Sequence, residues 1–178
     1  MKNKSFLAIA IFLNLSVFAQ QTRFYSDPES VFKEAKEYFQ KEQYSLAYPL
    51  FRQLKEAVRE TDKVSSPVTV QEITYYTTVC ALKQNEGRAE EEAQEFIDLQ
   101  KNTARVQMMS FHLGEFYFRE QKFADAAQQF EQTNIVNLSN REIADMKFHQ
   151  GYSYFTLQRF AEAKPMFNSI RTIKDDPN

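Results

Sequence analysis

The chain has little of the chemistry that most enzymes and disulfide-bonded proteins need. It contains no tryptophan, one cysteine, three glycines and five prolines in 178 residues. Cys80 is the single cysteine and has no partner for an internal disulfide, so packing must hold the fold together. Because the three glycines are scattered along the chain, the sequence contains neither a glycine-rich phosphate-binding loop nor a nucleophile elbow. We therefore expect a non-catalytic protein without a cofactor, in which Cys80 is a buried small hydrophobe rather than a reactive thiol.

The charged residues and the histidines exclude further classes of function. The net charge is −2, spread along the chain, whereas nucleic-acid binding needs a basic stripe. His112 and His149 lie 37 positions apart, a spacing that repetition of the sequence explains without a metal ion, so we expect no metal site. The acidic run Glu90-Glu91-Glu92, with Glu95, is typical of a solvated helix face, and a basic partner is the alternative interpretation.

Residues 1–19 are predicted to be a secretory signal peptide. Lys2 and Lys4 precede an apolar run over 6–18, and Ala19 ends a plausible cleavage site. The run is shorter than the roughly 20 apolar residues that span a bilayer, so we expect no membrane span after cleavage. Removing two lysines and no acid takes the net charge from −2 to −4. We expect a protein exported to the bacterial periplasm or secreted, with an uncleaved anchor as the alternative.

A pattern of residues recurs at a fixed displacement. Five residues return 37 positions later, as Gly114 and Gly151, Tyr117 and Tyr154, Phe123 and Phe160, Ala126 and Ala163, and Phe130 and Phe167. Another copy lies 79 positions upstream of the first set, at Ala35, Tyr38, Tyr44, Ala47 and Phe51. A period between about 20 and 50 residues is typical of stacked supersecondary units. The interval of 79 predicts one more, degenerate unit, in which Ala93 stands where the other copies have an aromatic residue.

Helical spacing of apolar residues continues through the rest of the chain, without sustained period-2 alternation. We therefore predict an all-α protein. Asp27 and Pro28 suit the start of a first helix, and Ser139 with Glu142 has the spacing of a capping box. The predicted organisation is a signal peptide over 1–19, an N-terminal extension over 20–27, a repeat domain over 28–173 and a tail over 174–178.

Two prolines occupy matching places in the repeated pattern. Pro49 and Pro165 each lie two residues before the large aromatic residue, Phe51 or Phe167. We expect both prolines near the start of the second helix of a pair, where a missing amide proton costs little.

The motif Leu113-Gly114-x-x-Tyr117, followed by Phe123, Ala126 and Phe130, resembles the tetratricopeptide repeat, a helix-turn-helix unit of about 34 residues. The resemblance covers roughly residues 28–170 but lacks the family tryptophan and the closing proline. It implies an α-solenoid of about four helix-turn-helix repeats in a right-handed superhelix. With its signal peptide, the pattern is similar to the N-terminal part of exported tetratricopeptide repeat proteins of Bacteroidetes.

This resemblance implies a concave surface, lined by the first helix of each pair, that binds a protein or peptide. Phenylalanines lie seven residues apart on one face of three of these helices. The candidate contact residues are these phenylalanines and their polar neighbours: Phe32, Lys36, Phe39, Gln40, Phe111, Glu115, Phe118, Arg119, Phe148, Tyr152 and Phe155. The alternative is that the phenylalanines pack one first helix on the next, as aromatic stripes at helical spacing usually do.

Two other functions are open from the sequence. The last hairpin, around Phe160, Met166 and Ile170, has no polar capping helix after it, and arrays usually need one for solubility. The chain would then be a structural segment or subunit of a longer array that self-associates through this end. Exposed tyrosines would alternatively serve glycan or cell-wall binding.

The export prediction is checked by intact mass spectrometry of the protein recovered from its native envelope. We expect a mature N-terminus at Gln20 or Gln21, because cleavage after a short apolar run removes the basic start with it. A protein that still begins at Met1 would contradict the signal peptide.

Overall fold

A computed structural model describes residues 27–60, 70–99 and 103–171 of the chain. The predicted signal peptide over 1–19, residues 20–26 of the predicted extension and the tail over 174–178 lie outside these residues. Across the described ranges every regular element is helical, which confirms the all-α prediction.

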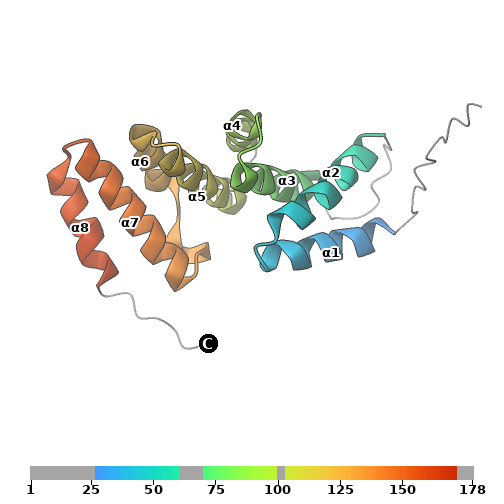
Figure 1. Cartoon of the computed structure of the whole chain (residues 1–178), viewed down its shortest axis with the longest axis horizontal. Coiled ribbons are helices and arrows are strands. Elements are labelled where there is room, and N and C mark those ends of the chain that lie inside the picture. Colours follow the sequence, from blue (N-terminus) through green and yellow to red (C-terminus); the bar gives the residue numbers. More distant parts are fainter. Residues whose placement is uncertain (1–26, 61–69, 100–102, 172–178) are drawn as a thin grey trace, which may run out of the picture.

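Eight α-helices and one short 3₁₀-helix follow one another along the described part of the chain. They are α1 (Pro28–Gln40), α2 (Tyr44–Glu60), α3 (Val70–Gln84), α4 (Ala89–Leu99), α5 (Thr103–Arg119), α6 (Phe123–Gln132), η1 (Ile135–Asn137), α7 (Asn140–Thr156) and α8 (Phe160–Ile170). Each α-helix packs against the next one in sequence, and α5 also packs against α3 and α7. Figure 1 shows α1 and α2 at one end of the longest axis and α7 and α8 at the other. The 3₁₀-helix was not anticipated from the sequence.

Local side-chain chemistry fixes two helix starts as predicted. The Asp27 carboxylate accepts a hydrogen bond from the amide of Ser30, and Pro28 occupies the first helical position, where no amide donor is needed. At the start of α7, Ser139 and Glu142 form a reciprocal capping box. Both predicted caps are confirmed.

The four helical hairpins share one turn geometry. In each hairpin a residue with positive φ ends the first helix: Glu42, Asn85, Gln121 and Gln158. The next residue donates its amide to a carbonyl five positions back, from Gln43 to Tyr38, Glu86 to Ala81, Lys122 to Tyr117 and Arg159 to Tyr154. This is the Schellman arrangement, and three of the four carbonyls belong to the repeated tyrosine. The repeated tyrosine therefore marks the end of a first helix.

The turns correct the predicted register of the second hairpin. Successive positive-φ turn residues are 43, 36 and 37 positions apart. The interval of 79 between the first and third hairpins is therefore made of two unequal repeats, of 43 and 36 residues. Gly87 and Arg88 lengthen the second turn, and the buried ring of α4 is Phe96, eleven residues after Asn85. In the other hairpins the large ring follows nine residues after the positive-φ residue. The interpretation of Ala93 as the replaced aromatic position was therefore wrong, because α4 starts later.

The first and second helices of a hairpin touch where a small residue faces a large ring. A β-carbon placed on Gly114 would lie 2.7 Å from Phe130 Cε1, and one on Gly151 would lie 3.0 Å from Phe167 Cε1. In the first hairpin, the equivalent Ala35 is fully buried. These contacts explain why the repeated position has a small residue, because the paired helices press together there.

The two matching prolines lie deeper in their helices than we predicted. Pro49 is the sixth residue of α2 and Pro165 the sixth residue of α8. An amide at this position would normally bond to the carbonyl four residues earlier, so each proline removes a helical hydrogen bond. The prediction of a position near the helix start, where the missing amide costs little, was wrong.

The hydrophobic core runs along the array rather than round a single centre. One continuous cluster extends from α1 to the start of α7, where Leu138 and Met146 belong to it. A smaller cluster joins α6, α7 and α8 through Ala127, Tyr154 and Ala163. The last hairpin is thus attached to the rest by a modest buried contact.

We expect Gly114→Ala to lower the free energy of unfolding by about 1–2 kcal/mol. The added methyl group would lie 2.7 Å from the buried Phe130 ring, closer than real β-carbons pack, so overpacking should cost about 2–3 kcal/mol, the upper part of its usual range, against a gain in helix propensity of about 1 kcal/mol. Urea unfolding followed by circular dichroism measures the change. Gly87→Ala is the matched control, since nothing lies within 4 Å of its β-carbon, and should stay within about 0.5 kcal/mol of the wild type. Equal stability of the two variants would contradict the close helix contact.

Candidate functional site

The three predicted phenylalanine pairs do not share one environment. Phe32 and Phe111 are buried, and Phe39 and Phe118 are partly buried against the core. Phe148 and Phe155, the equivalent pair on α7, are 48% and 56% exposed. The same repeat positions thus change from core to surface toward the C-terminal end of the array.

On α1 the candidate residues take part in packing. Phe32 lies edge-on to Phe51 and Tyr76, and Phe39 lies 4.9 Å from Tyr76. The Lys36 ammonium is 5.6 Å from the centres of the Phe32 and Tyr76 rings. Gln40 is exposed at the end of the helix. The aromatic residues of α1 therefore hold α1 against α2 and α3.

A group of partly exposed rings gathers where α5, α6 and α7 meet. Phe118, Phe123, Phe148 and Tyr152 form it, and we call this set the aromatic surface. Tyr152 lies 5.7 Å from Phe118, 5.6 Å from Phe123 and 6.4 Å from Phe148, so one tyrosine touches the other three rings. Its side chain is 43% exposed. Phe123, placed by the turn between α5 and α6, was not among the candidates.

His149 of α7 packs against two rings of the aromatic surface, Phe118 and Phe148. Its ring stacks on Phe118 with centroids 4.0 Å apart, and its Nδ1 lies 2.7 Å from Oε1 of Glu115. The candidate Glu115 on α5 thus holds a residue of α7 in place. Sequence reasoning explained His149 by repetition alone, and no spacing signal pointed to its carboxylate partner.

Two cations lie on the same side of α5 as Glu115. The Arg119 guanidinium donates to the carbonyl of Leu82 at 2.6 Å, which ties the end of α5 to α3. Lys83 follows Leu82, and burial lowers its pKa, with Glu115 acting in the opposite direction and Arg119 in the same one. Lys83 had no place among the candidates, because a lysine within an apolar helical run carries no sequence signal of its surroundings.

The last hairpin exposes more apolar area. Phe155 and Phe160 touch edge-to-face at 5.4 Å, and both are 56% exposed. Their equivalents one repeat earlier, Phe118 and Phe123, are partly covered by Tyr152 of α7. The exposure at the last hairpin therefore reflects the lack of a following helix in the described part of the chain.

Buried reactive groups are held in unreactive forms. Burial raises the pKa of the Cys80 thiol to about 12, and the side chain is fully buried, as predicted. Burial lowers the pKa of His112 to about 3, with Lys83 and Arg119 adding to the effect, so the ring is neutral. Its Nε2 lies 3.2 Å from the Tyr75 hydroxyl. Within the described residues, no group of three or more His, Cys, Asp and Glu side chains could hold a metal ion.

No protein-family model matches the chain, and no curated protein matches it. Within the ranges that the structure covers, no helix is both long and apolar enough to cross a bilayer. The geometry of the aromatic surface and of the last hairpin is therefore the basis for any functional conclusion.

Proposed function

We propose that the chain is a non-catalytic scaffold that binds a protein or peptide through the aromatic surface. The observation that carries this proposal is the exposure of Phe148 and Tyr152, which are 48% and 43% exposed, whereas Phe111 and Phe32, the upstream equivalents of Phe148, are buried. Tyrosine and phenylalanine supply large contact areas with few rotatable bonds, and such residues often dominate binding energy at protein interfaces. Polar groups at the edge, Glu115 and Arg119, would orient the bound segment.

The architecture that we propose around this surface is a tetratricopeptide-like α-solenoid of four helix-turn-helix repeats in a right-handed superhelix. The positive-φ turn residue and Schellman hydrogen bond that all four hairpins share, and the small-to-large contacts at Gly114 and Gly151, support it. In such an array the first helices line the concave face, where the aromatic surface would lie. Export to the periplasm or the cell exterior is proposed from the N-terminal sequence pattern alone.

A non-catalytic role agrees with the state of two side chains that could in principle do nucleophilic or acid–base chemistry, Cys80 and His112. Cys80 and His112 are buried, and burial keeps both uncharged near neutral pH. Neither side chain is placed to reach a substrate at the surface.

The binding proposal is tested by pull-down from an envelope extract with the chain from Gln20 onward, with and without Phe148→Ala/Tyr152→Ala. We expect a saturable partner whose retention falls at least tenfold in the double variant, because two central contact rings are removed. Both residues are exposed, so the variant should fold, which circular dichroism verifies. Ile135→Ala/Val136→Ala removes exposed apolar area on η1 and should bind as the wild type does. Absence of a saturable partner, or equal loss in both double variants, would count against the aromatic surface.

The second candidate function is self-association through the open last hairpin. The opposite end of the array is polar: Lys33, Glu34 and Glu37 of α1 are exposed where α5 has the buried residues His112, Leu113 and Phe116. An apolar last hairpin would gain little by stacking on such a face. Self-association would therefore join two last hairpins in a closed dimer rather than chains head to tail.

Light scattering separates the two candidates. A scaffold whose last hairpin is free should have the mass of one chain, about 21 kDa for the full sequence. A closed dimer should have twice that mass, and Phe155→Ser/Phe160→Ser should return it to a monomer, because both exposed rings would lie in the contact. If the wild-type chain stays a monomer at high concentration, the dimer proposal is wrong. A series of assemblies larger than two chains would contradict a closed dimer.

A further inference from the structure

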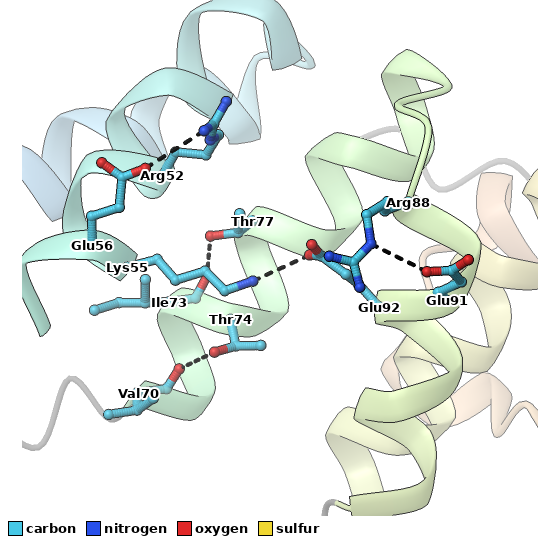
Figure 2. Close-up of polar contacts among 10 residues, drawn as sticks. All are labelled: Arg52, Lys55, Glu56, Val70, Ile73, Thr74, Thr77, Arg88, Glu91 and Glu92. Atoms are coloured by element: carbon cyan, nitrogen blue, oxygen red, sulfur yellow. Dashed lines mark hydrogen bonds and ion pairs between the residues drawn. The ribbon is translucent and has the colours of Figure 1, made fainter. Parts of the chain in front are cut away.

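A concave feature lies away from the aromatic surface, between α2, α3 and α4. It is a groove of about 180 Å³. Ile73 and Phe96 line it and are each 3% exposed, while Val70 and Leu99 line it and are 54% and 67% exposed. In Figure 2, Lys55 extends from α2 past α3 toward α4, where its ammonium lies 3.1 Å from Oε2 of Glu92. The groove thus has a buried apolar interior, an apolar entrance and a charged edge.

This groove depends on a feature that the other hairpins lack. The second helix α2 has 17 residues, whereas α4, α6 and α8 have 11, 10 and 11. Lys55 and Val58 lie in the additional turns of α2 and form one wall of the groove. In repeat proteins, departures of one unit from the common pattern often fall on a binding face.

Three consecutive carboxylates at the start of α4 are held in ion pairs. Glu92 pairs with Lys55, Glu91 with Arg88 and Glu90 with Lys122. Figure 2 shows two of these pairs, Arg88–Glu91 and Lys55–Glu92. These three carboxylates already have partners, so they leave little free negative charge.

Two further carboxylates on α4 have no basic partner among the described residues. Glu95 lines both the groove and a broad hollow on the adjoining side of α4, and Asp98 lines that hollow. Within the described ranges, the one hydrogen bond that Asp98 accepts comes from Gln94, at 3.1 Å. The side chain of Leu99 also lines both depressions, so an apolar contact lies together with two carboxylates that have no basic partner in the part of the chain that the structure describes.

We propose that this groove binds a basic polypeptide segment that inserts one bulky apolar side chain. A volume of about 180 Å³ suits one ring or branched side chain, since an apolar cavity of roughly 150 Å³ accepts benzene. The inserted side chain would contact Ile73 and Phe96. Lysine or arginine residues beside it would meet Glu95 and Asp98, and this complementary charge would select against acidic segments. The inference concerns a surface separate from the one in the proposed function.

The probe is a synthetic peptide of lysine and alanine residues with one central tryptophan. The chain has no tryptophan, so emission excited at the red edge of the indole band belongs to the peptide alone. We expect a saturable blue shift of this emission as the indole leaves water, and weaker binding at higher salt. Replacing the lysines of the peptide by glutamates should abolish the shift. N-acetyltryptophanamide should bind at least tenfold more weakly than the basic peptide.

Matched protein variants locate the binding. Glu95→Gln/Leu99→Ala removes one free carboxylate and one exposed wall of the groove, and should weaken peptide binding at least tenfold. The control Glu37→Gln/Val136→Ala makes similar changes at exposed positions on α1 and η1 and should change the affinity less than twofold. Phe148→Ala/Tyr152→Ala should also leave it unchanged, which separates this groove from the aromatic surface.

Three results would overturn the proposal. They are no saturable shift with the wild type at millimolar peptide, equal binding of the acidic peptide, and unchanged affinity in Glu95→Gln/Leu99→Ala. Binding of N-acetyltryptophanamide as tight as that of the basic peptide would assign the groove to a small aromatic molecule and would also overturn it. All substituted positions are exposed, so circular dichroism should show that each variant keeps the helical fold.

Discussion

The close contact between the two helices of a hairpin is the constraint on which the rest of the structure depends. A ring on the second helix fits only because the first helix has a small residue opposite it, as Phe130 does against Gly114. That small residue lies seven positions before the positive-φ residue of the turn, at Ala35, Gly114 and Gly151. Contact and turn therefore fix the two helices together, and the next hairpin packs on a defined surface.

The second hairpin shows the effect of changing this constraint. Thr78 occupies the equivalent position, seven residues before Asn85, and is fully buried. A threonine leaves no room for a ring at the same depth. The longer turn moves the buried ring to Phe96, which instead lies 6.0 Å from Tyr75. Together with the long α2, this altered packing surrounds the groove that we assign to a basic segment, so the irregular repeat and the binding feature have one physical origin.

Much of the fold could be predicted from the sequence because its signals are local. The helix caps at Asp27 and Ser139 and the helical periodicity depend on a few neighbouring positions. The exposure of each repeated residue could not be predicted, because it depends on which helix packs against it. Phe111 and Phe148 have the same residue type and the same place in the repeat, yet one is buried and the other 48% exposed. Repetition alone cannot distinguish these environments, because exposure is a property of the array and not of the unit.

The polar contacts between hairpins give Glu115 and Arg119 a structural role beside the binding role that we propose for them. Arg119 reaches the carbonyl of Leu82, and Glu115 reaches His149, so each joins α5 to a neighbouring first helix. A residue held in this way is preorganised, and a bound segment would lose little further entropy in ordering it. Both contacts cross between first helices, which lie close to one another over a shorter stretch than the two helices of a hairpin do. These polar groups border the aromatic surface, so a segment bound there, as we propose, would lie beside contacts that join adjacent first helices.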